Sequence, residues 1–121
     1  MATNNTRFIC ITMILALIII VSGVSPACSE VSFKDYETVK NTKEFKLYLG
    51  GIGEGIGWSN VVLDLRQSKK IFCQPSKLTM SVENLLDILK KEIDENGKTF
   101  KSDTPLGLIL IRGLVNTYPC K

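Results

Sequence analysis

Hydrophobic residues between Ser81 and Glu95 recur at the spacing of an amphipathic helix. The apolar members are Val82, Leu85, Leu86, Leu89 and Ile93. Intervals of three and four residues place such side chains on one face of an α-helix. Thr79 or Ser81 can cap the start of this helix, and Asn96-Gly97 is a typical stop signal. We expect its acidic residues to be solvated, and these are Asp87, Glu92, Asp94 and Glu95.

The pattern between Pro105 and Thr117 predicts a second helix. One face would hold Leu106, Ile109, Leu110, Gly113, Leu114 and Thr117. Pro105 suits the first helical position, where no backbone N–H is needed, and Thr104 can serve as the N-cap. The run LILI at 108–111 could also form a buried strand, so a strand remains the alternative. Pro119 ends the element in either case.

The stretch LGGIGEGIGWSN at residues 49–60 fits two secondary structures. Glycines alternate at 51, 53, 55 and 57, as on one face of a strand, and each interior glycine costs a helix about 1 kcal/mol relative to alanine. A spacing of fours and threes nevertheless continues through the stretch, at Phe45, Leu49, Ile52, Ile56, Ser59 and Leu63. That spacing favours a helix, with the strand as the alternative. Gly50, Gly53 and Gly57 would then form a smooth groove that another helix could approach closely.

A phosphate-binding loop does not fit the same glycines. A dinucleotide loop needs Gly-x-Gly-x-x-Gly between a strand and a helix. Counting from Gly51 the last position is Ile56, and counting from Gly53 it is Trp58. The Gly-Lys-Ser/Thr sequence of other phosphate loops is absent as well. We therefore expect no nucleotide cofactor.

An apolar run from Phe8 to Val21 follows Arg7 and precedes a segment of small residues. A positive start, a short apolar run and a small-residue exit are typical of a secretory signal peptide. The run is short for a membrane-spanning helix, which needs about 20 residues. We expect a signal peptide over 1–27 and an exported, periplasmic domain over 28–121, with an uncleaved anchor as the alternative.

The cysteines fit export to an oxidising compartment. Of the four, Cys10 lies in the predicted signal peptide. Cys73 and Cys120 are predicted to form one disulfide, which would stabilise the fold by roughly 4 kcal/mol. Cys28 is either a free thiol or the lipidated first residue of a lipoprotein. The small Ala27 before it fits lipidation, whereas Pro26 is unusual there.

The residue types present argue against several functions. Histidine is absent from all 121 residues, which removes Ser-His and Cys-His nucleophilic pairs and the commonest zinc ligand. Glu54 is the one acid in an unusual setting, and no second carboxylate is tied to it for acid–base chemistry. The net charge of +3 is not gathered into a basic stripe, so we expect no nucleic-acid partner. We predict a protein without catalytic activity, metal or cofactor.

Four segments carry a family resemblance through their order: KEFKLYLGGIGEGIGWSN, IFCQPSKLTMSVENLLDILKKEIDEN, LGLILIRGL and NTYPCK. A YLxGxGEGxxWxN helix, an FCxPxxLT entry into an amphipathic helix and a closing YPC resemble the Rap/Tai immunity proteins of bacterial type VI secretion. The first motif comprises Gly50, Gly53, Gly55, Trp58 and Asn60. The second comprises Phe72, Cys73, Pro75, Leu78 and Thr79, and the third Tyr118, Pro119 and Cys120.

The resemblance implies an exported, disulfide-bonded, all-helical protein. Such a protein binds and blocks a peptidoglycan-cleaving amidase that neighbouring cells deliver. The resemblance also implies that the glycine stretch is helical and that the first motif packs helices together. The motif residues would be architecture rather than contacts with the toxin.

These observations together predict a small all-α bundle stapled by one disulfide, acting as a stoichiometric amidase inhibitor. The candidate partner-binding loop is 96–103, with Lys98, Phe100 and Lys101. Phe100 could anchor a partner or fold back onto the core. The alternative function is an envelope-associated structural or adaptor lipoprotein without a toxin partner. A homodimer is compatible with either function.

Overall fold

The structure, a computed structural model, describes residues 30–121. The predicted signal peptide over 1–27 and Cys28 lie outside the described residues. The elements in chain order are the 3₁₀ turn η1 (Phe33–Asp35), α2 (Tyr36–Val39), α3 (Lys43–Leu65), α4 (Val82–Asn96), the 3₁₀ turn η2 (Gly97–Thr99) and α5 (Leu106–Thr117). The described part contains helices and no strand, so the predicted all-α fold is confirmed.

Helix α3 runs unbroken through the glycine stretch. Thr42 caps its start, because the Thr42 hydroxyl oxygen accepts a hydrogen bond of 3.1 Å from the Phe45 backbone N–H. Its end is set by Gln67, whose φ of 53° is left-handed and lets the Ser68 N–H donate to the Leu63 carbonyl at 2.8 Å. The helical interpretation of the stretch is confirmed and the strand alternative is wrong.

Helix α4 begins where its sequence signals predict, one residue after Ser81. The Ser81 hydroxyl oxygen accepts from the Asn84 N–H at 3.2 Å, and the Asn84 side-chain oxygen accepts from the Ser81 N–H at 3.1 Å. This reciprocal pair satisfies two donors that the first helical turn leaves free. Of the two predicted caps, Ser81 is the one used.

Helix α5 begins at Leu106, one residue later than predicted. Pro105 is the N-cap in extended conformation, not the first helical residue. The reason is that the N-terminal segment around Ser32 pairs with the backbone here. The Leu106 N–H donates to the Val31 carbonyl at 2.9 Å, and the Phe33 N–H donates to the Thr104 carbonyl at 2.8 Å. These bonds hold the 104–105 backbone extended. The strand alternative for LILI is wrong.

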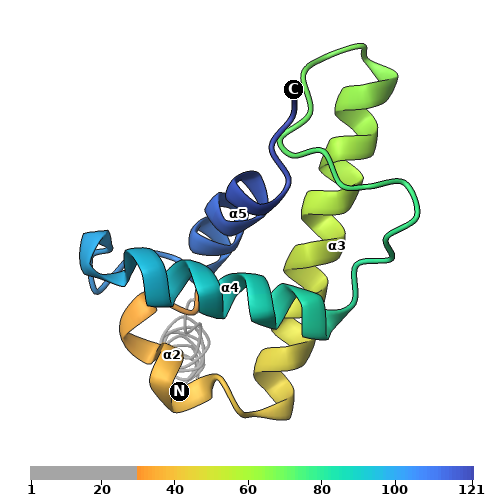
Figure 1. The fold of residues 1–121 in the computed structure, drawn as a ribbon. Coiled ribbons are helices and arrows are strands. Elements are labelled where there is room, and N and C mark those ends of the chain that lie inside the picture. Colours follow the sequence, from red (N-terminus) through yellow and green to blue (C-terminus); the bar gives the residue numbers. More distant parts are fainter. Residues whose placement is uncertain (1–29) are drawn as a thin grey trace, which may run out of the picture.

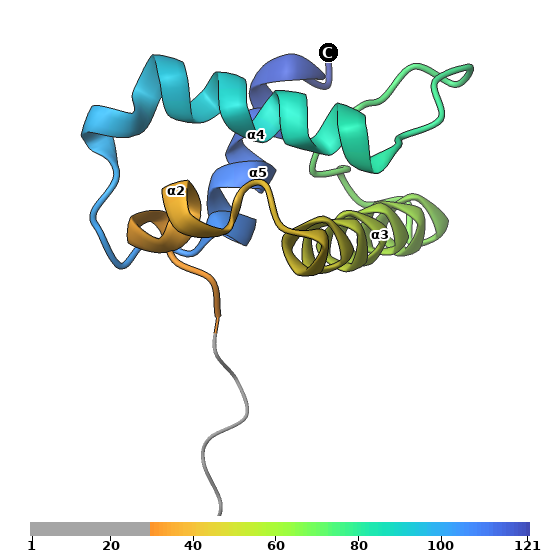
Figure 2. The same ribbon diagram turned by 90° about the horizontal axis from the view of Figure 1, so that it is seen from below.

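The helices pack around one hydrophobic core. Helix α4 lies across α3, and α5 packs against both of them, while α2 and the N-terminal segment close one end (Figures 1 and 2). The fully buried side chains are Leu49, Leu89, Leu106, Ile109, Leu110 and Leu114. Around them the core adds Tyr36, Phe45, Ile56, Phe72, Leu85 and Ile88. Figure 1 shows the C-terminal half of α3 extending past α4 and α5.

A glycine sets the close crossing of α4 and α5. A Cβ atom at Gly113 would lie 2.9 Å from the Ile88 Cγ2 and 3.2 Å from the Ile88 carbonyl oxygen. Carbon atoms essentially never approach that closely without displacement, and the backbone oxygen cannot turn aside. Only glycine therefore fits at this position without moving the helices apart.

Beside this crossing, a buried carboxylate ties α4 to α5. Glu92 is 3% exposed and accepts hydrogen bonds from Asn96 at 3.0 Å and from Asn116 at 2.9 Å. The Arg112 guanidinium lies 3.0 Å from the same carboxylate. The prediction that Glu92 is solvated is wrong, because α5 supplies two of its partners from a segment 20 or more residues away in the chain.

The packing of α4 against α3 predicts opposite effects at two glycines of the same stretch. A Cβ atom at Gly53 would overlap the Leu85 side chain, whereas one at Gly55 would meet nothing within 4 Å. Gly53→Leu should lower the free energy of unfolding by about 1–3 kcal/mol because it overpacks the crossing. Gly55→Ala should raise it by up to about 1 kcal/mol through helix propensity. Urea unfolding measures both, and equal effects would contradict the packing described.

The buried network predicts a second contrast, between two acids of α4. Glu92→Ala leaves Asn96, Arg112 and Asn116 without their shared acceptor and should cost about 1–3 kcal/mol of stability. Asp94→Ala should change stability by less than about 0.5 kcal/mol, because Asp94 is exposed and its one ion pair among residues 30–121, with Lys90, spans 3.9 Å. Thermal unfolding followed by circular dichroism compares them, and a Glu92→Ala variant as stable as the Asp94→Ala variant would be the contradictory result.

Candidate protein-binding surface

One side of α3 carries large apolar side chains that nothing in the described chain covers. We call this side the outer face of α3; its apolar members are Leu47, Trp58, Val61, Val62 and Leu65. Trp58 is 69% exposed and Leu65 is 79% exposed. Single exposed apolar residues are ordinary on protein surfaces, but Trp58, Val61, Val62 and Leu65 are neighbours at intervals of three and four residues, and such a group indicates a binding surface.

Helix geometry explains why this face points away from the core. Each residue of an α-helix is turned by about 100° from the one before, so a residue two positions after a buried one lies on the opposite side. Leu47 follows the buried Phe45 at that interval, and Trp58 follows the buried Ile56. Packing against α4 and α5 therefore turns the outer face to solvent. From Leu47 to Leu65 the face extends about 27 Å along the helix axis.

The predicted helix-packing motif divides between the two sides of α3. A Cβ atom at Gly50 would lie 3.2 Å from the Val82 Cγ2, and one at Gly53 would overlap Leu85, so both glycines admit α4. Cβ atoms at Gly55 and at Gly57 would meet nothing within 4 Å. Their predicted packing against a neighbouring helix is therefore wrong, because the turn of the helix carries them away from α4.

Trp58 needs the same correction. The first motif groups it with residues that pack helices, yet its indole is 69% exposed on the outer face. The helix turns by about 200° between Ile56 and Trp58, and Ile56 is the residue of the two that enters the core.

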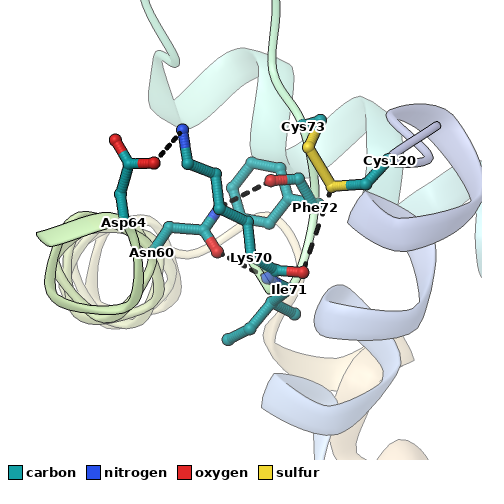
Figure 3. Close-up of polar contacts among 7 residues, drawn as sticks. All are labelled: Asn60, Asp64, Lys70, Ile71, Phe72, Cys73 and Cys120. Carbon is teal, nitrogen blue, oxygen red and sulfur yellow. Dashed lines mark hydrogen bonds and ion pairs between the residues drawn. A yellow bond between two sulfur atoms is a disulfide. The ribbon is translucent and has the colours of Figure 1, made fainter. Parts of the chain in front are cut away.

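Asn60, the last residue of that motif, holds the α3–α4 loop (residues 66–81) against α3. Its side-chain oxygen accepts from the Ile71 N–H at 2.8 Å, and its NH₂ group donates to the Phe72 carbonyl at 2.7 Å (Figure 3). Because Ile71 and Phe72 lie outside any helix, this one amide supplies two hydrogen bonds that secondary structure would otherwise provide. Asn60 thus packs a loop rather than a helix.

The disulfide anchors the same loop to the C-terminal end of the chain. Cys73 and Cys120 are bonded, as predicted, with their Cα atoms 4.9 Å apart (Figure 3). The Cys73 N–H donates to the Tyr118 carbonyl at 2.8 Å, which joins the second and third motifs through the backbone as well. Phe72 beside them is buried. These motif residues support the C-terminal end of α3, which extends past α4 and α5 in Figure 1.

A small cavity of about 240 Å³ lies between α3 and this loop. Its lining includes Asn60, Asp64, Lys70 and Gln74. Asp64 and Lys70 form an ion pair of 3.0 Å across its edge, and Asn60 is engaged by the loop backbone (Figure 3). Asp64 and Lys70 therefore pair with each other, while Asn60 and Gln74 bond to the loop backbone, which is the arrangement of a structural contact.

The predicted partner-binding loop is held against the body of the protein at its centre. The Phe100 ring packs edge-on against Phe33, with ring centroids 5.8 Å apart, and the Arg112 guanidinium lies 5.2 Å from the Phe100 centroid. Lys98 and Lys101 are exposed. Of the two interpretations of Phe100, its partly buried position fits folding back onto the core.

A second, smaller apolar surface lies beside Phe100. It is a hollow of about 340 Å³ whose lining includes Leu108, Ile111 and Arg112. Leu108 is 57% exposed. This hollow is the surface with which the outer face of α3 has to be compared in any binding experiment.

Displaced pKa values gather at the N-terminal corner and have structural causes. Hydrogen bonds from the Ser32 hydroxyl and N–H lower the pKa of Asp35. Burial raises the pKa of Tyr36 and of Tyr48. A hydrogen bond from the Lys40 ammonium to the Glu37 carboxylate raises the pKa of Lys40. These groups do not converge on a shared cavity, so the shifts indicate local packing.

Within residues 30–121, three or more Cys, Asp or Glu side chains nowhere approach closely enough to hold a metal ion. The described helices also include none that is long and apolar enough to cross a membrane. Comparisons of the chain with protein-family models, with curated proteins and with solved structures find no match.

The sequence interpretation missed most of the outer face. Leu47, Val61 and Leu65 did not belong to any predicted site, although the signal was available. Once Phe45, Leu49, Ile52 and Ile56 are assigned to the inner side, every residue two positions later must face outward. Two of the four residues at that interval, Leu47 and Trp58, are large and apolar, and Val61, Val62 and Leu65 follow on the far half, which is unusual for a solvent-facing helix side.

The two hydrogen bonds of Asn60 predict that its substitution will increase local unfolding of the α3–α4 loop. Asn60→Leu removes both hydrogen bonds to the loop, so stability should fall by about 1–2 kcal/mol and amide exchange at Ile71 should accelerate. Ser59→Ala is the matched control, because the Ser59 hydroxyl bonds only to the Gly55 carbonyl of its own helix, at 2.8 Å. Hydrogen exchange followed by NMR tests this, and unchanged protection of Ile71 in Asn60→Leu would refute it.

Proposed function

We propose that this protein is an exported protein-binding module that protects its cell as an immunity protein, by binding and inhibiting a peptidoglycan-cleaving amidase. The outer face of α3 is the observation that carries the proposal. It is an apolar surface on a rigid helix whose opposite side is fixed in the core. A stoichiometric inhibitor needs such a pre-organised surface, because binding then costs little ordering of the inhibitor.

The size of the face suits a protein partner. Five large apolar side chains of these exposures offer on the order of 500 Å² of surface, the range of a patch with a binding role. A partner that covers it would bury about 1,000 Å² in total, near the lower limit for a specific complex. Trp58 at its middle is the residue type most enriched among interface hot spots.

The resemblance to Rap/Tai immunity proteins supplies the class of partner. Several of its motif residues support the fold from the sides of α3 that face the rest of the protein, whereas Trp58 of the same motif lies on the outer face. Asn60 and Cys73 hold the loop, and Gly50 and Gly53 admit α4. These four residues agree with the expectation that motif residues are architecture, whereas the proposal assigns Trp58 to the partner instead. The predicted signal peptide would bring the protein to the compartment where peptidoglycan is cleaved.

Protection of cells tests this proposal. A candidate amidase, encoded beside this gene, is expressed in the periplasm of a susceptible bacterium with and without the full-length protein. We expect lysis to be prevented by the wild type and by Leu108→Glu, but not by Trp58→Glu. The two variants place the same charge on the two exposed apolar surfaces, so they distinguish the outer face from the hollow beside Phe100.

Both variants must first be shown to be helical and soluble by circular dichroism, which their exposed positions allow. Protection by Trp58→Glu together with failure of Leu108→Glu would move the site to the hollow. Equal lysis with and without the wild-type protein would reject the immunity function for that amidase. A version without residues 1–27 should remain in the cytoplasm and fail to protect.

A further inference from the structure

A single carboxylate lies among the apolar residues of the outer face. Glu54 follows the inward-facing Ile52 by two positions, so it points to the same side as Leu47 and Trp58. Glu54 is exposed. Within residues 30–121 its carboxylate has neither an ion pair nor a hydrogen bond, whereas Asp64 near the end of α3 is paired with Lys70.

The backbone of α3 is bare around this carboxylate. Cβ atoms at Gly51 and Gly55 would meet nothing within 4 Å, so the fold does not require glycine at either position. Each glycine nevertheless costs the helix about 1 kcal/mol relative to alanine. Gly51 and Gly55 therefore leave a shallow depression in the surface between the large side chains of Leu47 and Trp58, which we call the saddle. This shape lets a second helix approach closely.

We propose that the outer face of α3 binds an amphipathic α-helix of a partner protein, whose apolar side chains lie between Leu47 and Leu65 and whose Lys or Arg pairs with Glu54. This inference rests on the proposed function for the role of the face and adds the chemistry of its occupant. Charge complementarity decides the occupant: an apolar surface that covers Glu54 must supply a cation, since an unpaired carboxylate is costly to remove from water.

The same carboxylate disfavours a second copy of this chain. In a parallel pair of α3 helices the two Glu54 residues lie at the same level. In an antiparallel pair centred on the outer face they lie about 6 Å apart along the axis. Like charges at that distance repel, and the repulsion grows as the interface excludes water.

A lipid surface fits less well for a related reason. Amphipathic helices that lie on membranes present an uninterrupted apolar face with basic residues at its edges. Here an acid lies near the middle of the face, next to glycines that contribute no apolar contact. Insertion would carry Glu54 toward the acyl region without a partner. A helix with a matched cation is the occupant that satisfies every residue of the face.

Trp58 provides a direct measurement, because it is the only tryptophan in the chain. The protein is purified in its exported form, and its emission is followed during titration with two synthetic amphipathic peptides. The peptides have identical leucine faces and differ only in a central Lys or Glu. We expect the Lys peptide to shift the Trp58 emission to shorter wavelength and to bind about three- to tenfold more tightly than the Glu peptide.

Substitutions then assign the effect to the proposed geometry. Glu54→Lys should reverse the preference, so that the Glu peptide binds more tightly. Gly55→Leu should weaken the Lys peptide because it fills the saddle. Thr117→Leu is the control: Thr117 is exposed at the end of α5, so the same side chain is added away from the outer face and binding should be unchanged. Circular dichroism confirms that each variant remains helical.

Several outcomes would overturn the inference. These are equal affinity for both peptides, no emission change with either, or a preference that Glu54→Lys does not reverse. An emission shift on raising protein concentration alone would identify a second copy as the occupant, and a shift with anionic phospholipid vesicles alone would identify a lipid surface. The peptides need no amidase, so a charge-reversed preference without cellular protection would retain the helix-binding face and reject the immunity function.

Discussion

The fold depends on the contact between Gly53 of α3 and Leu85 of α4. Because a glycine hydrogen replaces a side chain there, α4 can lie directly on the α3 backbone, with Val82 over Gly50 one turn away. This contact fixes the rotation of α3 about its own axis. Phe45, Leu49 and Ile56 are then buried, and every residue on the other side must face solvent. The outer face is thus a consequence of the core packing.

The far half of α3 needs separate support, since α4 and α5 do not extend along it (Figure 1). Asn60 supplies that support through two hydrogen bonds to the α3–α4 loop, and the Cys73–Cys120 bond fixes the loop to the end of α5 (Figure 3). Closing a long loop restricts the unfolded chain, so the disulfide stabilises a fold whose core is small. Through Asn60, the loop held in this way is joined to the part of α3 that carries Trp58 and Leu65.

Local signals predicted the helices well, because caps and apolar spacing act within a few residues. Ser81 before α4 is such a signal, and the spacing from Phe45 to Ile56 overrode the poor helix propensity of the glycines. Properties that depend on a second helix could not be read in this way. The burial of Glu92 required Arg112 and Asn116 of α5, and the start of α5 was shifted by pairing with Val31.

The candidate surface shows the same limit. Gly50, Gly53, Gly55 and Gly57 look alike in the sequence, and only the position of α4 separates the first two from the others. Trp58 was assigned to packing for the same reason. Which apolar side of α3 is left uncovered is decided by the neighbouring helices, so the exposed Leu47 and Leu65 follow from tertiary structure and not from a motif.

The central claim is that the outer face of α3 is covered by a protein partner. Hydroxyl-radical labelling of the purified complex with a candidate amidase, read residue by residue by mass spectrometry, measures this coverage directly. Trp58 and Leu65 should become protected relative to the free protein, while Leu108, exposed on α5, should be labelled as before. Unchanged labelling of Trp58 in a complex that inhibits the amidase would contradict the account.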